Sequence, residues 1–307
     1  MAVGIKVFAP ASVANVACGY DVLGFALEEP GDEIVITKVD KKGLRITKIT
    51  GGKLPYDPLK NTAGFAALKV LEHLEYDGGL EMEIHKKMPF GSGLGSSAAS
   101  AVAGAMAVNE VLNKPLTKQE LLPFAVLGEQ IADGAYHADN VAPSLLGGMV
   151  LIRDTQTLDF HKVYIPDGLY VVVIHPHIEI LTKDSRGILK TEVSLADHIK
   201  QSANLAGLML GMQNSNFELI KNSLEDIIIE PQRAHLIPHF YDIKNAALTN
   251  GALGCSISGA GPSIFALCDS TIIAENVAIQ MEKVLLDQKI SCTIYKSRIN
   301  NEGAILC

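Results

Sequence analysis

Residues 89–99 decide the fold of this chain, and they read Pro89-Phe90-Gly91-Ser92-Gly93-Leu94-Gly95-Ser96-Ser97-Ala98-Ala99. The alternating residues Leu80-Glu81-Met82-Glu83-Ile84 lie before them and predict a strand with one wet face. Residues 96–112 are rich in alanine and predict a helix. Alternating glycines at such a junction let the backbone curl around an anion, and the helix start adds free amides and a positive dipole end. The stretch predicts a phosphate-binding loop, although a plain glycine-rich turn would also let strand and helix meet.

Two common nucleotide-binding motifs are excluded at this loop. A Walker loop needs a lysine before the serine, and none precedes Ser96 or Ser97. The dinucleotide fingerprint G-x-G-x-x-G fails because its spacing breaks after Gly93. The hydroxyls of Ser96 and Ser97 can cap the helix, bind phosphate oxygen or ligate Mg²⁺.

Composition narrows the classes of protein and partner. The 307 residues are twice the usual length of one domain, so we expect two domains. A formal charge of −8 leaves no cationic surface for a phosphate backbone, so we expect no nucleic-acid partner. The sequence shows no basic segment followed by an apolar run, so we expect no signal peptide. It also has no run of about 18 apolar residues, so we expect no membrane partner. The five cysteines are scattered, which predicts a cytoplasmic protein without a disulfide framework or zinc site.

Strand-like and helical runs alternate along the rest of the chain. Residues 170–174 predict a buried strand that ends at His175-Pro176. Thr117 and Glu120 form a capping-box pattern, and residues 271–288 carry a core-facing apolar stripe. The fold class is therefore α/β or α+β. Polar residues near 154–167 interrupt the apolar pattern, and we divide the chain into residues 1–160 and 161–307.

The glycine-rich loop resembles the second conserved motif of the GHMP kinases. Ala9-Pro10-Ala11-Ser12-Val13-Ala14-Asn15 is similar to the first motif of that family. Residues 254–263, Gly-Cys-Ser-Ile-Ser-Gly-Ala-Gly-Pro-Ser, are similar to the third motif, and they also fit a hairpin turn between two strands. The resemblance covers essentially the whole chain. It implies an α+β fold of two domains: an N-terminal nucleotide-binding domain like domain 2 of ribosomal protein S5, and a ferredoxin-like C-terminal domain.

Three further stretches look specifically like the homoserine kinases within this family. They are residues 15–27, residues 137–143 and Glu230-Pro231-Gln232-Arg233. The resemblance implies transfer of the γ-phosphoryl group of ATP to the hydroxyl of L-homoserine, a step toward threonine, with Mg²⁺. It also implies a homodimer, since members of the family are often homodimers.

The resemblance also assigns roles to individual residues. For homoserine, it implies contacts to the backbone and hydroxyl from Asn15, Asp21, His137 and Asp139, contacts to the carboxylate from Arg186 and Arg233 with Thr182 nearby, and close backbone approach at Gly259. For Mg²⁺, it implies Ser97 and Glu129 as ligands. For the nucleotide, it implies contacts on the adenine side from Asn61 and Thr62. An amino-acid substrate requires residues of these types, since a carboxylate prefers guanidinium groups that bind it with two hydrogen bonds. Without the resemblance, each has a plainer interpretation: a turn residue for Asp21, a surface charge for Arg186, Arg233 or Glu129, and a local cap for His137 and Asp139.

The sequence leaves open which group accepts the proton of the acceptor hydroxyl. Asn140 stands where other members of the family carry an aspartate base, and an amide is no base at neutral pH. Our hypothesis is that Asn140 positions the hydroxyl while its proton passes to the γ-phosphate; the alternative makes Asp139 the base. At the level of function, homoserine kinase is the first hypothesis. Another small-molecule GHMP kinase and a non-enzymatic ligand sensor are the alternatives.

Overall fold

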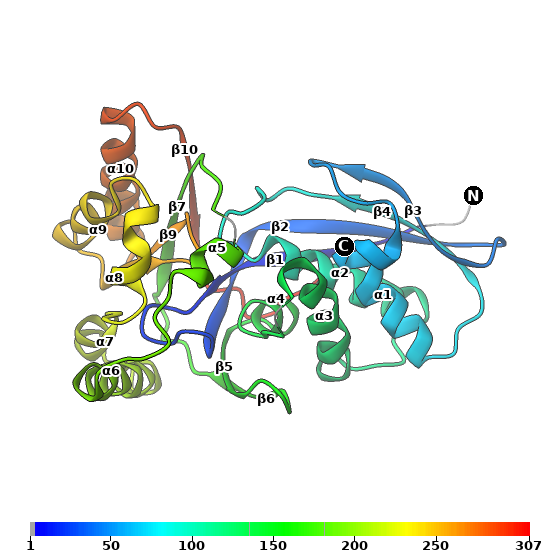
Figure 1. Cartoon of the computed structure of the whole chain (residues 1–307), viewed down its shortest axis with the longest axis horizontal. Coiled ribbons are helices and arrows are strands. Elements are labelled where there is room, and N and C mark those ends of the chain that lie inside the picture. Colours follow the sequence, from blue (N-terminus) through cyan, green and yellow to red (C-terminus); the bar gives the residue numbers. More distant parts are fainter. Residues whose placement is uncertain (1–3, 135, 181) are drawn as a thin grey trace.

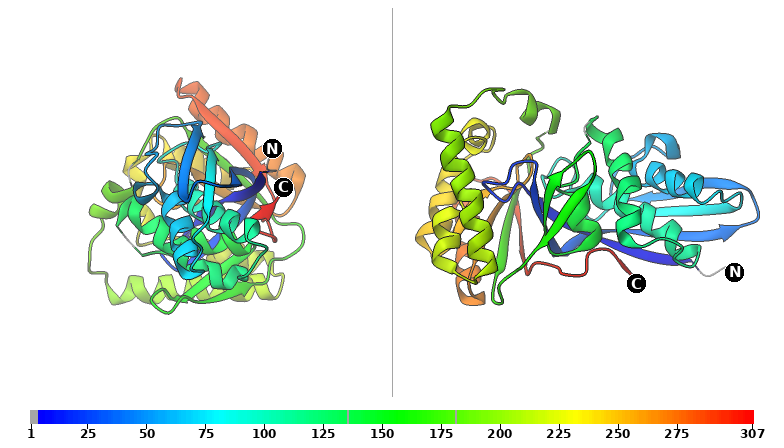
Figure 2. Two further views of the ribbon diagram at one scale, coloured as in Figure 1. Left: turned by 90° about the vertical axis from the view of Figure 1, so that its right-hand side faces the viewer. Right: turned by 90° about the horizontal axis from the view of Figure 1, so that it is seen from below.

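Two β-sheets organise the chain, and the computed structural model describes residues 4–134, 136–180 and 182–307 (Figure 1). The molecule is elongated along the long strand β2 (Leu23–Val39), with helix α1 (Thr62–His73) toward one end and α10 (Thr271–Asp287) at the other. The view from below shows α6 to α10 gathered at one end and α1 to α3 toward the other (Figure 2, right).

The first sheet follows the order β11-β1-β2-β4-β3, with β5 and β6 branching from β2. Its other strands are β1 (Ile5–Ala14), β3 (Gly43–Thr50), β4 (Gly79–His85), β5 (Met149–Asp154), β6 (Asp159–Val163) and β11 (Ile305–Leu306). Only β3 and β4 pair in parallel among these strands of the described chain, and α1 connects them. The predicted strand at residues 80–84 is confirmed as β4, whose residues alternate between buried and half-buried.

Helix α2 (Ser96–Val111) lies at the centre of the N-terminal half, where every one of its residues except Ser97 is buried. It packs against β1, β2 and α1. A Cβ on Gly104 would lie 2.2 Å from the carbonyl oxygen of Ala63 in α1, so the small residues of α2 allow close helix packing as well as contact with the sheet. The neighbouring elements are η1 (Pro58–Lys60), α3 (Lys118–Asp133) and α4 (Val141–Leu146). The predicted capping box of Thr117 and Glu120 is confirmed at the start of α3.

The second sheet is antiparallel and follows the order β10-β7-β9-β8. Its strands are β7 (Tyr170–Pro176), β8 (Gly254–Ile257), β9 (Ile264–Cys268) and β10 (Cys292–Ser297). Strands numbered in chain order then run 4-1-3-2, with helices in the first and last connections, which is the ferredoxin-like arrangement. The remaining helices are α5 (Thr182–Gly187), α6 (Leu195–Gln213), α7 (Phe217–Ser223), α8 (Glu230–Arg233), η2 (Ala234–Leu236) and α9 (Phe240–Thr249).

Strand β7 includes His175-Pro176, the two residues at which the sequence predicts its end. Its pairing with β9 stops at Ile174, while its pairing with β10 continues to Pro176. Proline is tolerated there because only one neighbouring strand remains, so no second ladder needs its missing N–H. The predicted helix at residues 271–288 is confirmed as α10, and Val277 and Met281 of its stripe are fully buried.

The first sheet continues through Val163 and the second begins at Tyr170. We propose that the division between the two halves lies in this interval, a few residues after the predicted residue 160, with β11 returning to the first sheet. Among the described residues, no helix has the length and apolar character needed to cross a membrane. The predicted homodimer and cytoplasmic location stay predictions.

Candidate active site

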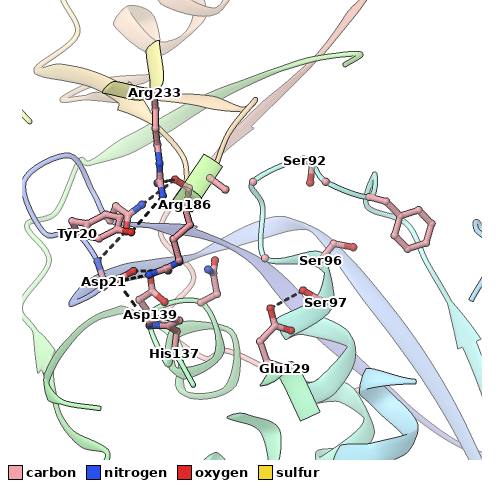
Figure 3. Close-up of a pocket in the computed structure, with 18 residues that line it drawn as sticks. Tyr20, Asp21, Ser92, Ser96, Ser97, Glu129, His137, Asp139, Arg186 and Arg233 are labelled. Carbon is pink, nitrogen blue, oxygen red and sulfur yellow. Dashed lines mark hydrogen bonds and ion pairs between the residues drawn. The ribbon is translucent and has the colours of Figure 1, made fainter. Parts of the chain in front are cut away.

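A pocket of about 150 Å³ lies where segments from both halves of the chain meet (Figure 3). The N-terminal half contributes the loop after β1, the loop between β4 and α2, one residue of α3 and the segment before α4, and the C-terminal half contributes α5, α8 and the β8–β9 turn. The residues that line it are Asn15, Tyr20, Asp21, Phe90, Gly91, Ser92, Gly93, Gly95, Ser96, Ser97, Glu129, His137, Asp139, Asn140, Arg186, Arg233, Gly259 and Ala260. Most residues predicted from the resemblance are therefore brought together.

The glycine-rich loop adopts a backbone conformation that is sterically unfavourable for residues with side chains. Gly91, Gly93 and Gly95 have φ angles of 57°, 77° and 64°, in the left-handed region. Gly95 is the N-cap of α2 and no described side chain caps this helix, so of the three roles open to the hydroxyls of Ser96 and Ser97, phosphate binding and Mg²⁺ ligation remain. The hydroxyl of Ser96 is buried and has no hydrogen-bond partner among the described residues. Free amides and an unpartnered hydroxyl at a helix start are suited to binding an anion.

The third motif holds this loop in place from the C-terminal half. The hydroxyl of Ser258 donates to the carbonyl oxygen of Gly93 at 2.7 Å, and the Ser263 N–H donates to that of Ser92 at 3.1 Å. Strands β8 and β9 form the predicted antiparallel hairpin. The turn of this hairpin also contributes Gly259 and Ala260 to the pocket lining, so the interpretations of residues 254–263 as a hairpin and as a binding loop are compatible.

Ser97 and Glu129 face each other at the start of α2. The Ser97 hydroxyl donates to Glu129 Oε1 at 2.6 Å (Figure 3). Both side chains offer oxygen ligands, which Mg²⁺ prefers, and this ion usually keeps several waters and binds few carboxylates. The pair therefore fits a Mg²⁺ ion shared with phosphate oxygens. No cluster of three or more acidic, histidine or cysteine side chains suited to a metal occurs in the described part of the chain.

Asp21 and Arg186 form a two-pronged ion pair on the other side of the pocket. Arg186 Nη1 and Nη2 donate to the two Asp21 carboxylate oxygens at 2.9 Å and 3.0 Å. Burial opposes the charge of Arg186, but its bonds to Asp21 outweigh this and raise the pKa of the guanidinium. His137 Nδ1 lies 4.0 Å from Asp21. Oppositely charged groups here match the two charged ends of an amino acid.

Tyr20 organises the arginines, and the sequence patterns did not single it out. The guanidinium carbons of Arg186 and Arg233 lie 5.7 Å and 5.2 Å from the centre of its ring, and Arg233 donates to its hydroxyl at 3.4 Å. Such contacts are attractive because the ring face is negative. Burial raises the pKa of the Tyr20 hydroxyl. The only sequence signal was its place beside Asp21 in the stretch of residues 15–27.

Asn15 and Gly259 tie the first motif to the third. Asn15 Nδ2 donates to the carbonyl oxygen of Gly259 at 2.9 Å, and Asn15 Oδ1 accepts from the Asp21 N–H at 3.0 Å. Arg233 donates to the same Gly259 carbonyl at 3.1 Å. Asn15 and Asp21 have φ angles of 72° and 60°, a strained region for residues with side chains, and such strain clusters at functional sites.

Asp139 is a buried carboxyl group in the pocket, only 5% exposed. Burial, together with the neighbouring Asp21 carboxylate, raises the pKa of Asp139 to about 7. A carboxyl group poised near neutral pH is suited to proton transfer. Asn140 lies beside it, and its Oδ1 accepts a hydrogen bond from Ser12 at 2.8 Å.

Some predicted residues do not line the pocket. Asn61 is engaged elsewhere, since it caps α1 through the Gly64 N–H and donates to the carbonyl oxygen of Pro55. The predicted adenine contacts of Asn61 and Thr62 stay predictions. Pro89, Leu94, Ala98 and Ala99 of the loop also lie outside the lining. Thr182 begins α5, and its side chain lies outside the described part of the structure.

Comparison with known proteins places the chain in a family. The GHMP kinase N-terminal domain matches residues 61–148, and the GHMP kinase C-terminal domain matches residues 206–285. The homoserine kinases of Chlorobium phaeobacteroides and Chloroherpeton thalassium are 45% and 46% identical, each over 97% of both chains. The crystal structure of homoserine kinase from Cytophaga hutchinsonii is 50% identical and superposes with a TM-score of 0.97 over 99% of this chain and 97% of that one. The chain, a two-domain GHMP kinase in its fold, belongs to the homoserine kinase family.

Proposed function

We propose that this protein transfers the γ-phosphoryl group of ATP to the hydroxyl of L-homoserine and forms O-phospho-L-homoserine, a step toward threonine. The observation that carries the proposal is the pairing, in one pocket, of an anion-binding loop with the Asp21–Arg186 ion pair. The loop suits a nucleotide phosphate, and the ion pair suits a zwitterion. A neutral sugar would use the loop but not the charges.

The amino acid enters by exchange with the existing ion pair. In the structure, the Asp21 carboxylate occupies the Arg186 fork in the way a substrate carboxylate would. The substrate carboxylate takes its place on Arg186, with Arg233 and Tyr20 behind it. Asp21, released from Arg186, then accepts the substrate ammonium. A monoanion without an ammonium would leave the half-buried Asp21 without its ion-pair partner, so the exchange favours substrates carrying both charges.

The backbone amides of Gly91–Ser97 would bind the nucleotide phosphates, and Ser97 and Glu129 would hold Mg²⁺. When bound, Mg²⁺ neutralises phosphate charge. Phosphoryl transfer depends mostly on positioning and charge neutralisation, so the protein needs little covalent chemistry of its own. The chain supplies the loop amides, the Ser96 hydroxyl and the placement of the acceptor alcohol.

Asn140 orients the acceptor hydroxyl, and no side chain removes its proton in this account. The proton passes to an oxygen of the transferred phosphoryl group as the new O–P bond forms and the bond to ADP breaks. Asp139, with its pKa near neutrality, is the alternative base. The two routes differ in how turnover responds when Asp139 becomes an amide.

A coupled ADP-release assay tests the proposed substrate. Purified protein with Mg·ATP is offered L-homoserine, L-serine, L-threonine, mevalonate and galactose separately. We expect rapid ADP release with L-homoserine and little with the others. Turnover of another alcohol in place of homoserine would keep the kinase and reject this substrate; bound ATP without turnover of any of them would favour a ligand sensor.

A further inference from the structure

Ser12 lies where the phosphate loop, the start of α2 and Asn140 meet. It is fully buried in β1. Its N–H donates to the carbonyl oxygen of Leu94 at 3.0 Å, and its hydroxyl donates to Asn140 Oδ1 at 2.8 Å. One buried residue thus contacts both the backbone that surrounds the nucleotide phosphates and the side chain that faces the acceptor.

Gly95 shows how closely these groups approach. A Cβ at this position would lie 2.3 Å from Ser12 Oγ and 2.8 Å from Asn140 Oδ1. The hydrogen-bonded pair therefore fills the space directly beside the N-cap of α2. Moving Ser12 or Asn140 would therefore shift the loop backbone at Gly95, and moving that backbone would shift Asn140.

The amide of Asn140 has two chemically different ends. Oδ1 only accepts hydrogen bonds, whereas Nδ2 carries two N–H donors. Because Ser12 donates to Oδ1, Nδ2 is the end available to a ligand in the pocket. Held in this way, Asn140 donates to the oxygen of an acceptor alcohol. If the amide rotated, Oδ1 would instead accept the alcohol proton and hold it away from the phosphoryl group.

We propose that Ser12 is a positioning residue for phosphoryl transfer, and this inference rests on the proposed function. Its hydroxyl fixes the orientation of Asn140, so that Nδ2 donates to one lone pair of the substrate oxygen. The other lone pair forms the bond to the γ-phosphorus, while the bond from phosphorus to the ADP oxygen breaks and its electron pair stays on ADP. The hydroxyl proton, directed away from Asn140, moves to an oxygen of the transferred group.

A double-mutant cycle tests whether Ser12 acts through Asn140. Steady-state kinetics are measured for the wild type, Ser12→Ala, Asn140→Ala and the double variant. We expect Ser12→Ala to lower kcat about 10- to 100-fold, the size of effect that a small misplacement of reacting groups produces. The KM for the alcohol and the Kd for ATP stay within about threefold of the wild type. The double variant has the kcat of Asn140→Ala alone.

Two outcomes overturn the inference. In one, kcat of Ser12→Ala stays close to that of the wild type. In the other, the losses of the two single variants multiply in the double variant, so that Ser12 acts independently of Asn140. If Ser12→Ala does not fold, the same cycle is run with Ser12→Cys, which fills the space but offers only a weak S–H donor.

Ser144→Ala is the matched control. Ser144 is fully buried in α4, and its hydroxyl donates to the carbonyl oxygen of Pro10 in β1 at 2.7 Å. This change removes a similar hydrogen bond between the segment around Asn140 and β1 without touching the amide. We expect a lower Tm with kcat nearly unchanged. A loss of kcat equal to that of Ser12→Ala would assign the effect to packing and overturn the inference.

Failure of the proposed substrate is distinguishable from failure of this inference. If the wild type phosphorylates a different alcohol, homoserine is rejected and the cycle is run with that alcohol, where the same coupling is expected. If the wild type phosphorylates homoserine and the losses multiply, only the role of Ser12 is rejected.

Discussion

Asp21 and Arg186 lie 165 residues apart in the chain and close a two-pronged ion pair across the pocket, with N–O distances of 2.9 Å and 3.0 Å. The pair joins the loop after β1 to α5, so both halves of the chain contribute to the proposed amino-acid end of the site. In the proposed exchange, the substrate separates these groups and satisfies both. The charge requirement of the enzyme follows from this arrangement.

Arg186→Ala is expected to weaken homoserine binding while ATP binding is retained. Hydrogen bonds to charged groups contribute about 1.5–3 kcal/mol, so the KM for homoserine should rise about 10- to 150-fold. The control is Arg153→Ala, because Arg153 is 64% exposed and pairs with Asp159 in the neighbouring strand β6. Equal effects of the two substitutions on KM would reject a carboxylate contact by Arg186.

Ser97→Ala and Glu129→Gln are expected to lower kcat and to raise the Mg²⁺ concentration needed for half-maximal rate. Ser97→Ala removes an oxygen ligand, and Glu129→Gln replaces a charged carboxylate with a neutral amide, so the proposed site binds the ion less tightly. The measurement is a Mg²⁺ titration of the rate at saturating ATP and homoserine. Glu72→Gln removes an exposed carboxylate from α1 and serves as the control. An unchanged Mg²⁺ requirement in both site variants would place the ion elsewhere.

Asp139 makes folding stability depend on pH in a direction that can be worked out. Its pKa is about 7 in the folded protein, above its ordinary value, so the folded state holds a proton that the unfolded state has released. The free energy of unfolding of the wild type, relative to Asp139→Asn, should therefore fall as pH rises from about 4 to about 7, with a slope of up to about 1.4 kcal/mol per pH unit. Urea unfolding of both proteins across this range measures the difference, and a pH-independent difference would contradict it.

The same variant separates the two routes for the acceptor proton. If the proton passes to the phosphoryl group, Asp139→Asn keeps a substantial kcat. If Asp139 is the base, turnover is abolished while homoserine still binds, and our account of the proton is wrong. Single-turnover product formation together with a binding titration distinguishes a lost chemical step from lost substrate binding.

Gly95→Ala is expected to distort the phosphate loop. The added Cβ meets Ser12 Oγ at 2.3 Å and also occupies the left-handed region, which costs about 1–2 kcal/mol for an ordinary residue. Gly134→Ala isolates the second effect, since Gly134 has φ 83° and a Cβ added there would meet no heavy atom of the described residues within 4 Å. We expect ATP affinity to fall only for Gly95→Ala. Similar ATP affinities in both variants would show that the contact at Gly95 has no influence on the nucleotide site.

The sequence predicted what local patterns encode. The glycine-rich junction between β4 and α2, the capping box of α3 and the hairpin of residues 254–263 each depend on neighbours within a few residues, and all were located correctly. The N-cap of α2 was left open by the sequence, because serine is the commoner cap, whereas Gly95 takes that place beside the Ser12–Asn140 pair. Tyr20 was missed because its role depends on arginines far along the chain. Contacts of this kind leave no periodic or local signal.

The most direct test of the central claim is the identity of the phosphorylated product. Purified protein, Mg·ATP and L-homoserine are incubated together, and ³¹P NMR follows the reaction with authentic O-phospho-L-homoserine as reference. Our account predicts a phosphomonoester signal coincident with the reference, growing in equal amount to ADP. ADP formation accompanied only by inorganic phosphate, or no consumption of ATP, would contradict it.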